Sequence, residues 1–173
     1  MLITALLGIL GALLQSILLD QSHEQFSLHY IVYWGTIAMI GACGALTAVA
    51  YRYYRSPSRW DREMWIEAAW LFVPSLLVGG VITVAIAAQY PELADLLPSI
   101  WMLLFGLGIW SVAKVFSRAT YLVASYYFIA GSVSLLAAAK YPFAPAMMFI
   151  GFGIGQLLMS GVLAYDEKTQ AGE

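Results

Sequence analysis

Charged side chains are scarce in this chain, and their scarcity excludes most soluble folds. Asp, Glu, Lys and Arg make up 10% of the residues and hydrophobic residues make up 62%, whereas about a quarter of a soluble domain is charged. A soluble fold of this size needs polar residues to cover its surface, and this chain lacks them. The net charge of -2 is too small to indicate nucleic acid or an acidic substrate. The composition therefore indicates a membrane protein.

The residues of catalytic and metal chemistry are also few. The single cysteine, Cys43, lies in an apolar run and has no partner for an internal disulfide. The sequence contains no C-x-x-C motif or zinc-ligand spacing. It shows no nucleophile beside a base, no paired carboxylates and no phosphate-binding loop. An enzyme is therefore the least favoured class, and we expect no cofactor.

Six apolar stretches are each about as long as the roughly 20 residues that cross a bilayer as a helix. They cover residues 2–19, 29–51, 66–88, 98–115, 120–139 and 144–165. Pro91 and Pro142 follow spans, because proline lacks the N–H that a helix interior needs. The first span has no positive flank and is predicted to be retained rather than cleaved as a signal peptide. The pattern predicts an all-α bundle of about six transmembrane helices in three hairpins, one domain over residues 1–173.

Basic residues favour one side of this arrangement. Seven of the eight share a side, and they are Arg52, Arg55, Arg59, Arg62, Lys114, Arg118 and Lys168. Lys140 falls on the other side. Because cytoplasmic loops are rich in Lys and Arg, both termini are predicted to be cytoplasmic. Aromatic residues near the outer ends of the spans, on the side away from the seven basic residues, are typical of an interfacial belt. They are Tyr30, Tyr33, Trp34, Tyr90, Trp101 and Tyr141.

The second and third predicted hairpins share a sequence pattern. The pattern G-x-[IV]-[ST]-[VL]-x-x-A-A-x-Y-P begins at Gly80 and again at Gly131. A proline follows each copy, and a Phe-Gly-x-Gly segment then occupies 105–108 and 152–155. Both copies begin on the cytoplasmic side, so we predict a parallel repeat about an axis along the membrane normal.

The glycines of the two Phe-Gly-x-Gly segments are typical of close helix packing in membranes. They are Gly106, Gly108, Gly153 and Gly155. Since glycine has no side chain, two backbones approach closely there. The alternative is that these glycines open room for a ligand.

Three pieces of the C-terminal half resemble a group of small uncharacterised bacterial multi-pass inner-membrane proteins. These pieces are Leu-Pro-Ser-Ile-Trp at 97–101, Phe-Gly-Leu-Gly at 105–108 and Gly-Phe-Gly at 151–153. The resemblance implies a bacterial inner membrane and no known activity. Members of the group often carry a histidine where this chain has Gln156, so the chain departs from the pattern there.

Polar residues inside the predicted spans are candidates for function, because they are costly to place in lipid. Gln156 and Ser160 are four residues apart and share a face of the last span, and Ser132 and Ser134 lie on the span before it. We expect interhelical hydrogen bonds for these residues and for Gln15. The alternative is a small polar ligand pocket lined by Gln156.

Four residues near the first predicted outer loop are weak metal-ligand candidates, namely Asp20, His23, Glu24 and His29. Carboxylates and imidazoles bind zinc or copper. Their spacing matches no ligand motif, and His23-Glu24 lacks the second histidine of a metalloprotease signature. We therefore expect solvated loop residues.

The segment after the second span is rich in arginine, at positions 52, 55, 59 and 62, with Tyr53, Tyr54 and Trp60 between them. Arginines beside a membrane span bind anionic lipid headgroups, and we expect that role here. Docking of a cytoplasmic partner is the alternative.

Two functional classes remain. A non-catalytic scaffold, assembly or signalling subunit is favoured, with membrane lipids and a second copy or another membrane protein as partners, and without nucleic acid. A small-molecule transporter or ligand-binding bundle is the alternative. A parallel repeat favours transport, whereas the lack of a carboxylate at mid-membrane argues against coupling to protons. A solid core with an exposed apolar face would indicate assembly, and a polar-lined cavity would indicate transport.

Overall fold

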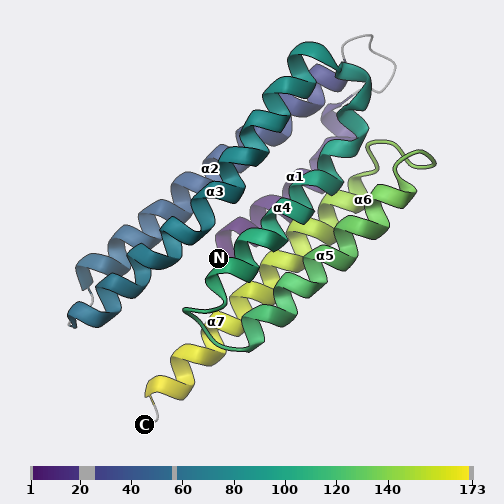
Figure 1. Ribbon diagram of the computed structural model, residues 1–173. Coiled ribbons are helices and arrows are strands. Elements are labelled where there is room, and N and C mark those ends of the chain that lie inside the picture. Colours follow the sequence, from purple (N-terminus) through teal and green to yellow (C-terminus); the bar gives the residue numbers. More distant parts are fainter. Residues whose placement is uncertain (1, 20–25, 56–57, 172–173) are drawn as a thin grey trace.

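The chain folds from helices, which the computed structural model describes for residues 2–19, 26–55 and 58–171 (Figure 1). The main helices are α1 (Leu2–Leu18), α2 (Phe26–Arg55), α3 (Arg59–Gln89), α4 (Leu97–Val112), α5 (Ala119–Ala137), α6 (Pro145–Met148) and α7 (Gly155–Ala171). A 3-10 helix, η1 (Pro91–Leu96), leads into α4, and a π-helix, η2 (Phe149–Ile154), joins α6 to α7. No strand occurs in these residues, so the predicted all-α class is confirmed.

Five helical segments are long and apolar enough to cross a membrane. They are α2, the Arg62–Gln89 part of α3, Pro91–Val112, α5 and Pro145–Asp166. The sixth apolar helix, α1, has 17 residues and is about 25 Å long at 1.5 Å per residue, slightly less than the hydrocarbon core of about 30 Å. The chain is therefore a multi-pass membrane protein.

α2 and α3 are longer than the sequence predicts. They contain 30 and 31 residues, which corresponds to about 45 Å each. The arginine-rich segment predicted as a loop is helical up to Arg55 and again from Arg59. Charge limits how deep a residue lies in lipid, but Arg and Glu are good helix formers, so the helices continue beyond the apolar stretch.

One end of the molecule carries most of the basic residues, and we term it the cationic end. The end of α2, the start of α3, the α4–α5 loop and the end of α7 all lie there (Figure 1). Arg55 ends α2, Arg59 begins α3, and Lys114 and Arg118 lie between α4 and α5. Lys140 follows α5 at the opposite end. The helices therefore place the basic residues as the six-span arrangement requires.

The molecule divides into a packed body and a less covered hairpin. The body consists of α1, α4, α5 and the continuous helix from α6 to α7, and the hairpin consists of α2 and α3 (Figure 1). In the most apolar 18 residues of each span, 44% of the α4 segment is buried, as is 39% of α5 and 39% of the α6–α7 helix. The corresponding share is 11% for each hairpin helix. The hairpin therefore presents most of its apolar surface outward.

Two aromatic residues predicted for the interfacial belt lie in the interior instead. Tyr30 and Trp34 of α2 are 0% and 2% exposed. The ring of Phe143, from the α5–α6 loop, lies 4.9 Å from that of Tyr30. Tyr90 and Tyr141, by contrast, are exposed at the end of the molecule opposite the cationic end. Sequence position alone does not separate a ring at the lipid interface from one under a neighbouring helix.

The structure does not confirm the internal repeat. The first Phe-Gly-x-Gly segment, 105–108, lies within the regular α-helix α4, whereas the second, 152–155, begins in the π-helix η2. A 3-10 helix leads into α4, whereas a loop leads into α6, which precedes η2. The two copies therefore share a sequence pattern without the same local geometry.

Candidate functional site

Tyr127 of α5 lies between the two Phe-Gly-x-Gly segments and is fully buried. The centroid of its ring is 5.2 Å from that of Phe105 and 6.2 Å from that of Phe152. The Phe105 and Phe152 rings are 5.6 Å apart. We term these three rings the aromatic centre. No motif in the sequence points to Tyr127, although a tyrosine far from both ends of a span is a signal of a buried polar group.

Glycines provide the space that Tyr127 occupies. A Cβ atom on Gly106 of α4 would lie 2.9 Å from the Tyr127 Cβ, and one on Gly155 of α7 would lie 2.5 Å from its hydroxyl oxygen. Ordinary side chains do not tolerate such distances. Tyr127 therefore fits only because both neighbouring helices carry glycine at these positions.

The other two predicted packing glycines meet different helices. A Cβ on Gly108 would lie 2.6 Å from the ring of Phe72 on α3, and one on Gly153 would lie 2.9 Å from Ile9 on α1. Side chains already fill the space at these positions, which favours packing over a ligand cavity.

The π-helix η2 is held by a tyrosine of the neighbouring helix. The hydroxyl of Tyr126 on α5 donates a hydrogen bond of 2.5 Å to the carbonyl oxygen of Ile150. A π-helical turn disturbs the usual pairing of backbone groups, and such turns are frequent at functional sites. The wider turn also changes the helix register, so the following residues, including Gln156, face a different direction than in a continuous α-helix.

A small polar cluster lies next to the aromatic centre. The hydroxyl of Thr4 on α1 donates a hydrogen bond of 3.0 Å to the side-chain oxygen of Gln156. Gln156 is 6% exposed and lies near the middle of the span Pro145–Asp166. The Tyr127 hydroxyl lies beside Gln156 without a hydrogen bond of good geometry to the residues described. The cluster consists of one amide and two hydroxyls, so its groups are able to form hydrogen bonds with neutral polar partners, and none of the three is a carboxylate that could carry a proton.

The serines predicted for this pocket do not all lie at it. Ser160 is half-buried on α7, one turn from Gln156, whereas Ser132 is exposed on α5. Ser134 is buried, but it lies about two helical turns from Tyr127 along α5. The structure therefore joins Gln156 to Thr4, a residue that the sequence analysis did not select.

A second polar network joins α1, α2 and the α5–α6 loop. The side-chain amide of Gln15 donates a hydrogen bond of 2.7 Å to the carbonyl oxygen of Phe143, and its oxygen accepts one of 3.1 Å from the indole of Trp34. Gln15 is 2% exposed, and the interhelical bond expected for it is present. Phe143 has a φ angle of 55°, which is uncommon for a residue with a side chain.

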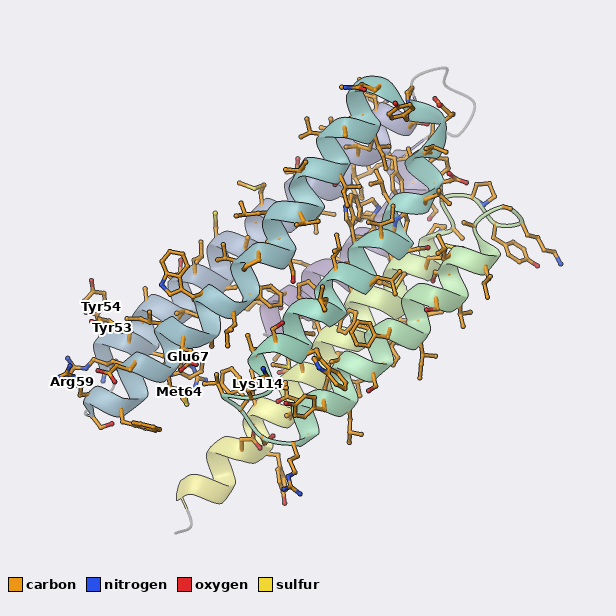
Figure 2. All side chains as sticks on the ribbon, viewed as in Figure 1. Tyr53, Tyr54, Arg59, Met64, Glu67 and Lys114 are labelled. Carbon is orange, nitrogen blue, oxygen red and sulfur yellow. The ribbon has the colours of Figure 1, made fainter. Side chains whose placement is uncertain are left out.

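The four predicted lipid-binding arginines are exposed at the cationic end. They are Arg52, Arg55, Arg59 and Arg62. The guanidinium of Arg52 lies 5.1 Å from the ring centre of Trp65, and the Nε atom of Arg59 lies 2.8 Å from a carboxylate oxygen of Glu63. Figure 2 shows Arg59 with Tyr53 and Tyr54 at the tip of the hairpin.

The metal hypothesis involves residues that the structure describes only in part. His29 lies in the first turns of α2, whereas Asp20, His23 and Glu24 lie outside the described residues. In the part of the chain that is described, no group of three His, Cys, Asp or Glu side chains lies close enough to hold a metal.

At the cationic end, Glu67 and Lys114 are both exposed (Figure 2).

No protein-family model matches this chain, and no curated protein or solved structure matches it. Its class therefore follows from its own fold, which is that of an all-α multi-pass membrane protein.

Proposed function

We propose that this protein is a non-catalytic assembly subunit whose hairpin binds the transmembrane helix of a partner. The observation that carries this proposal is a contrast between two sets of glycines. An added Cβ would meet a heavy atom within 3.0 Å at Gly8, Gly11, Gly106, Gly108, Gly131, Gly151, Gly153 and Gly155. Nothing lies within 4 Å of an added Cβ at Gly35, Gly44, Gly80 or Gly161, and three of these four are on the hairpin.

Gly44 marks the surface that we propose as the interface. Gly44, Thr47 and Ala48 are exposed on α2, and Gly44 with Ala48 forms the small-xxx-small pattern of membrane helix contacts. At Gly41, one turn earlier, an added Cβ would lie 3.7 Å from Thr4 near the start of α1. The surface therefore begins just beyond the N-terminal end of α1, and we term it the Gly44 face.

A partner helix suits the Gly44 face better than lipid does. Helices associate in membranes mainly through close packing, and small residues allow the closest approach of two backbones. Towards lipid alone, a leucine at this position would be as favourable as glycine and would form helix more readily. An open glycine followed four positions later by a second small residue, as Gly44 is by Ala48, therefore supports a contact with another chain, either a second copy or a different membrane protein. Gly35 is also open but is followed four positions later by Met39, so it lacks this pattern.

The filled body supports assembly over transport. The glycines that would have opened room for a ligand are packed against Tyr127, Phe72 and Ile9. The groove that the described residues form on the surface of α7 is apolar. These features fit a solid core with an exposed apolar hairpin.

The orientation and lipid contacts belong to the same proposal. We propose that the cationic end faces the cytoplasm of a bacterium and that its four arginines bind anionic headgroups. The clustering of basic residues at one end supports both statements, and the resemblance to bacterial inner-membrane proteins supports the source.

The test uses two substitutions on opposite sides of α2. Gly44 is nine positions after Gly35, and at 100° per position the two glycines face opposite directions. Native mass spectrometry from mild detergent should show the parent and Gly35→Leu bound to a partner or second copy, and Gly44→Leu alone. Retention of the complex in Gly44→Leu, with the same partner and stoichiometry, would contradict the proposal.

A ligand-binding bundle is the second candidate, and one observation favours it. The buried hydroxyl of Tyr127 lies beside Gln156 without a well-formed hydrogen bond to the residues described, so a small neutral ligand has a donor and an amide to bind. A bound mass that survives in the parent and disappears in Gln156→Leu would support this function. An unchanged mass spectrum would remove it.

A further inference from the structure

A groove runs along the outside of the body between the start of α5 and the second half of α7. It has a volume of about 550 Å³ and is lined by Ala119, Ile154, Leu157, Leu158, Gly161, Val162 and Tyr165. Its floor at Gly161 is open, since nothing lies within 4 Å of an added Cβ there. The lining is almost entirely apolar, so its occupant is apolar along most of its length.

The length of the groove distinguishes a lipid chain from a helix. From Ile154 to Tyr165 the groove follows eleven residues of helix, which correspond to about 16 Å. That length is about half of the 30 Å hydrocarbon core, or one leaflet. A transmembrane helix of a partner would run through both leaflets, whereas an acyl chain extends through one.

The groove ends among charged groups at the cationic end. Ala119, which lines the groove, begins α5, and Arg118 directly before it is exposed. Lys114 in the same loop is also exposed. Asp166, next to Tyr165 on α7, is half-buried at this end of the groove, so the described charged side chains of the α4–α5 loop and of α7 there are two cations and one carboxylate. The N-terminus of a helix adds a further attraction for anions.

We infer that this groove holds one acyl chain of an anionic phospholipid from the leaflet at the cationic end, with the phosphate beside Arg118. The apolar lining and one-leaflet length define the chain, and the excess positive charge where the groove ends defines the headgroup. Anionic lipids are characteristic of the cytoplasmic leaflet. This site lies on α5 and α7, so it is independent of the Gly44 face on α2.

The experiment measures lipid retention by native mass spectrometry of the full chain in mild detergent. The protein is titrated with phosphatidylglycerol or phosphatidylcholine of the same acyl chains. Three variants are compared with the parent: Arg118→Gln removes the cation, Gly161→Trp fills the groove, and Lys140→Gln removes a cation at the opposite end. The melting temperature of each variant, measured by circular dichroism, identifies any folding defect, and Gly161→Leu replaces Gly161→Trp if the larger side chain lowers it.

We expect one tightly retained phosphatidylglycerol in the parent and in Lys140→Gln. Arg118→Gln should weaken its binding about fivefold, the factor that one basic residue near an anionic membrane contributes, and filling Gly161 should abolish it. Equal retention of both lipids, or retention unaffected by filling Gly161, would overturn the inference. Competition by inorganic phosphate without dependence on Gly161 would identify a phosphate site instead. Loss of a second protein copy on filling Gly161 would identify a helix interface.

Discussion

The fit of Tyr127 against Gly155 makes a quantitative prediction about what stabilises the body. In Gly155→Ala the new Cβ would lie 2.5 Å from the Tyr127 hydroxyl oxygen and 2.9 Å from a ring carbon. Tyr127 is fully buried between two phenylalanine rings, so it has no space into which to move. Overpacking of this kind costs about 1–3 kcal/mol.

Gly161→Ala is the matched control, because Gly161 is in the same helix and has nothing within 4 Å of its added Cβ. Alanine is favoured over glycine in a helix by about 1 kcal/mol, and this gain applies to both variants. The difference in unfolding free energy between them therefore isolates the clash. We expect Gly155→Ala to be less stable than Gly161→Ala by about 1–3 kcal/mol.

The assay is reversible unfolding in mixed micelles with increasing dodecyl sulfate, followed by circular dichroism. A double-mutant cycle with Tyr127→Leu tests the cause, because the clash disappears when the ring is gone. The coupling between the two positions should be about 0.5–3 kcal/mol. Equal unfolding midpoints for Gly155→Ala and Gly161→Ala, or no coupling to Tyr127→Leu, would refute the reasoning.

Three further predictions concern hydrogen bonds and orientation. Gln15→Leu removes the bonds to Trp34 and to the Phe143 carbonyl and should lower the unfolding free energy by about 1–2 kcal/mol in the same assay, whereas an unchanged value would show that the network is not stabilising. Tyr126→Phe leaves the Ile150 carbonyl without its hydroxyl donor, so amide hydrogen exchange in η2 should become faster, and unchanged exchange would contradict this role. Reporter fusions at both ends of the chain should report the cytoplasmic side, and an external signal from either end would reject the proposed orientation.

The membrane class and the helices were predictable because both depend on composition along the chain. Apolar stretches of about 20 residues are long enough to cross a bilayer, and the structure places a helix at each predicted span. The boundaries of α2 and α3 were not predictable from hydropathy. Arg52 and Arg62 ended the predicted spans through their charge, yet both lie within helices, because a helix does not stop where the lipid does.

The site was predictable only in part, because it depends on which helices become neighbours. The Phe-Gly-x-Gly pattern drew attention to Gly106 and Gly155, but nothing in the pattern names Tyr127 as the residue that they accommodate. Gln156 was selected as an intramembrane amide, whereas its partner Thr4 lies 152 residues away in sequence. The π-helix before Gln156 also changes which face the amide occupies, and sequence periodicity assumes a regular α-helix.

The most direct test of the proposed function is site-specific photocrosslinking in native membranes. A photoreactive amino acid is placed at position 44, on the Gly44 face, and at position 35 on the opposite side of α2. Since both glycines are open in the structure, neither substitution disturbs the fold. We predict a protein adduct of higher mass from position 44 and none from position 35. Lipid adducts alone at position 44, or equal protein adducts at both positions, would contradict the account.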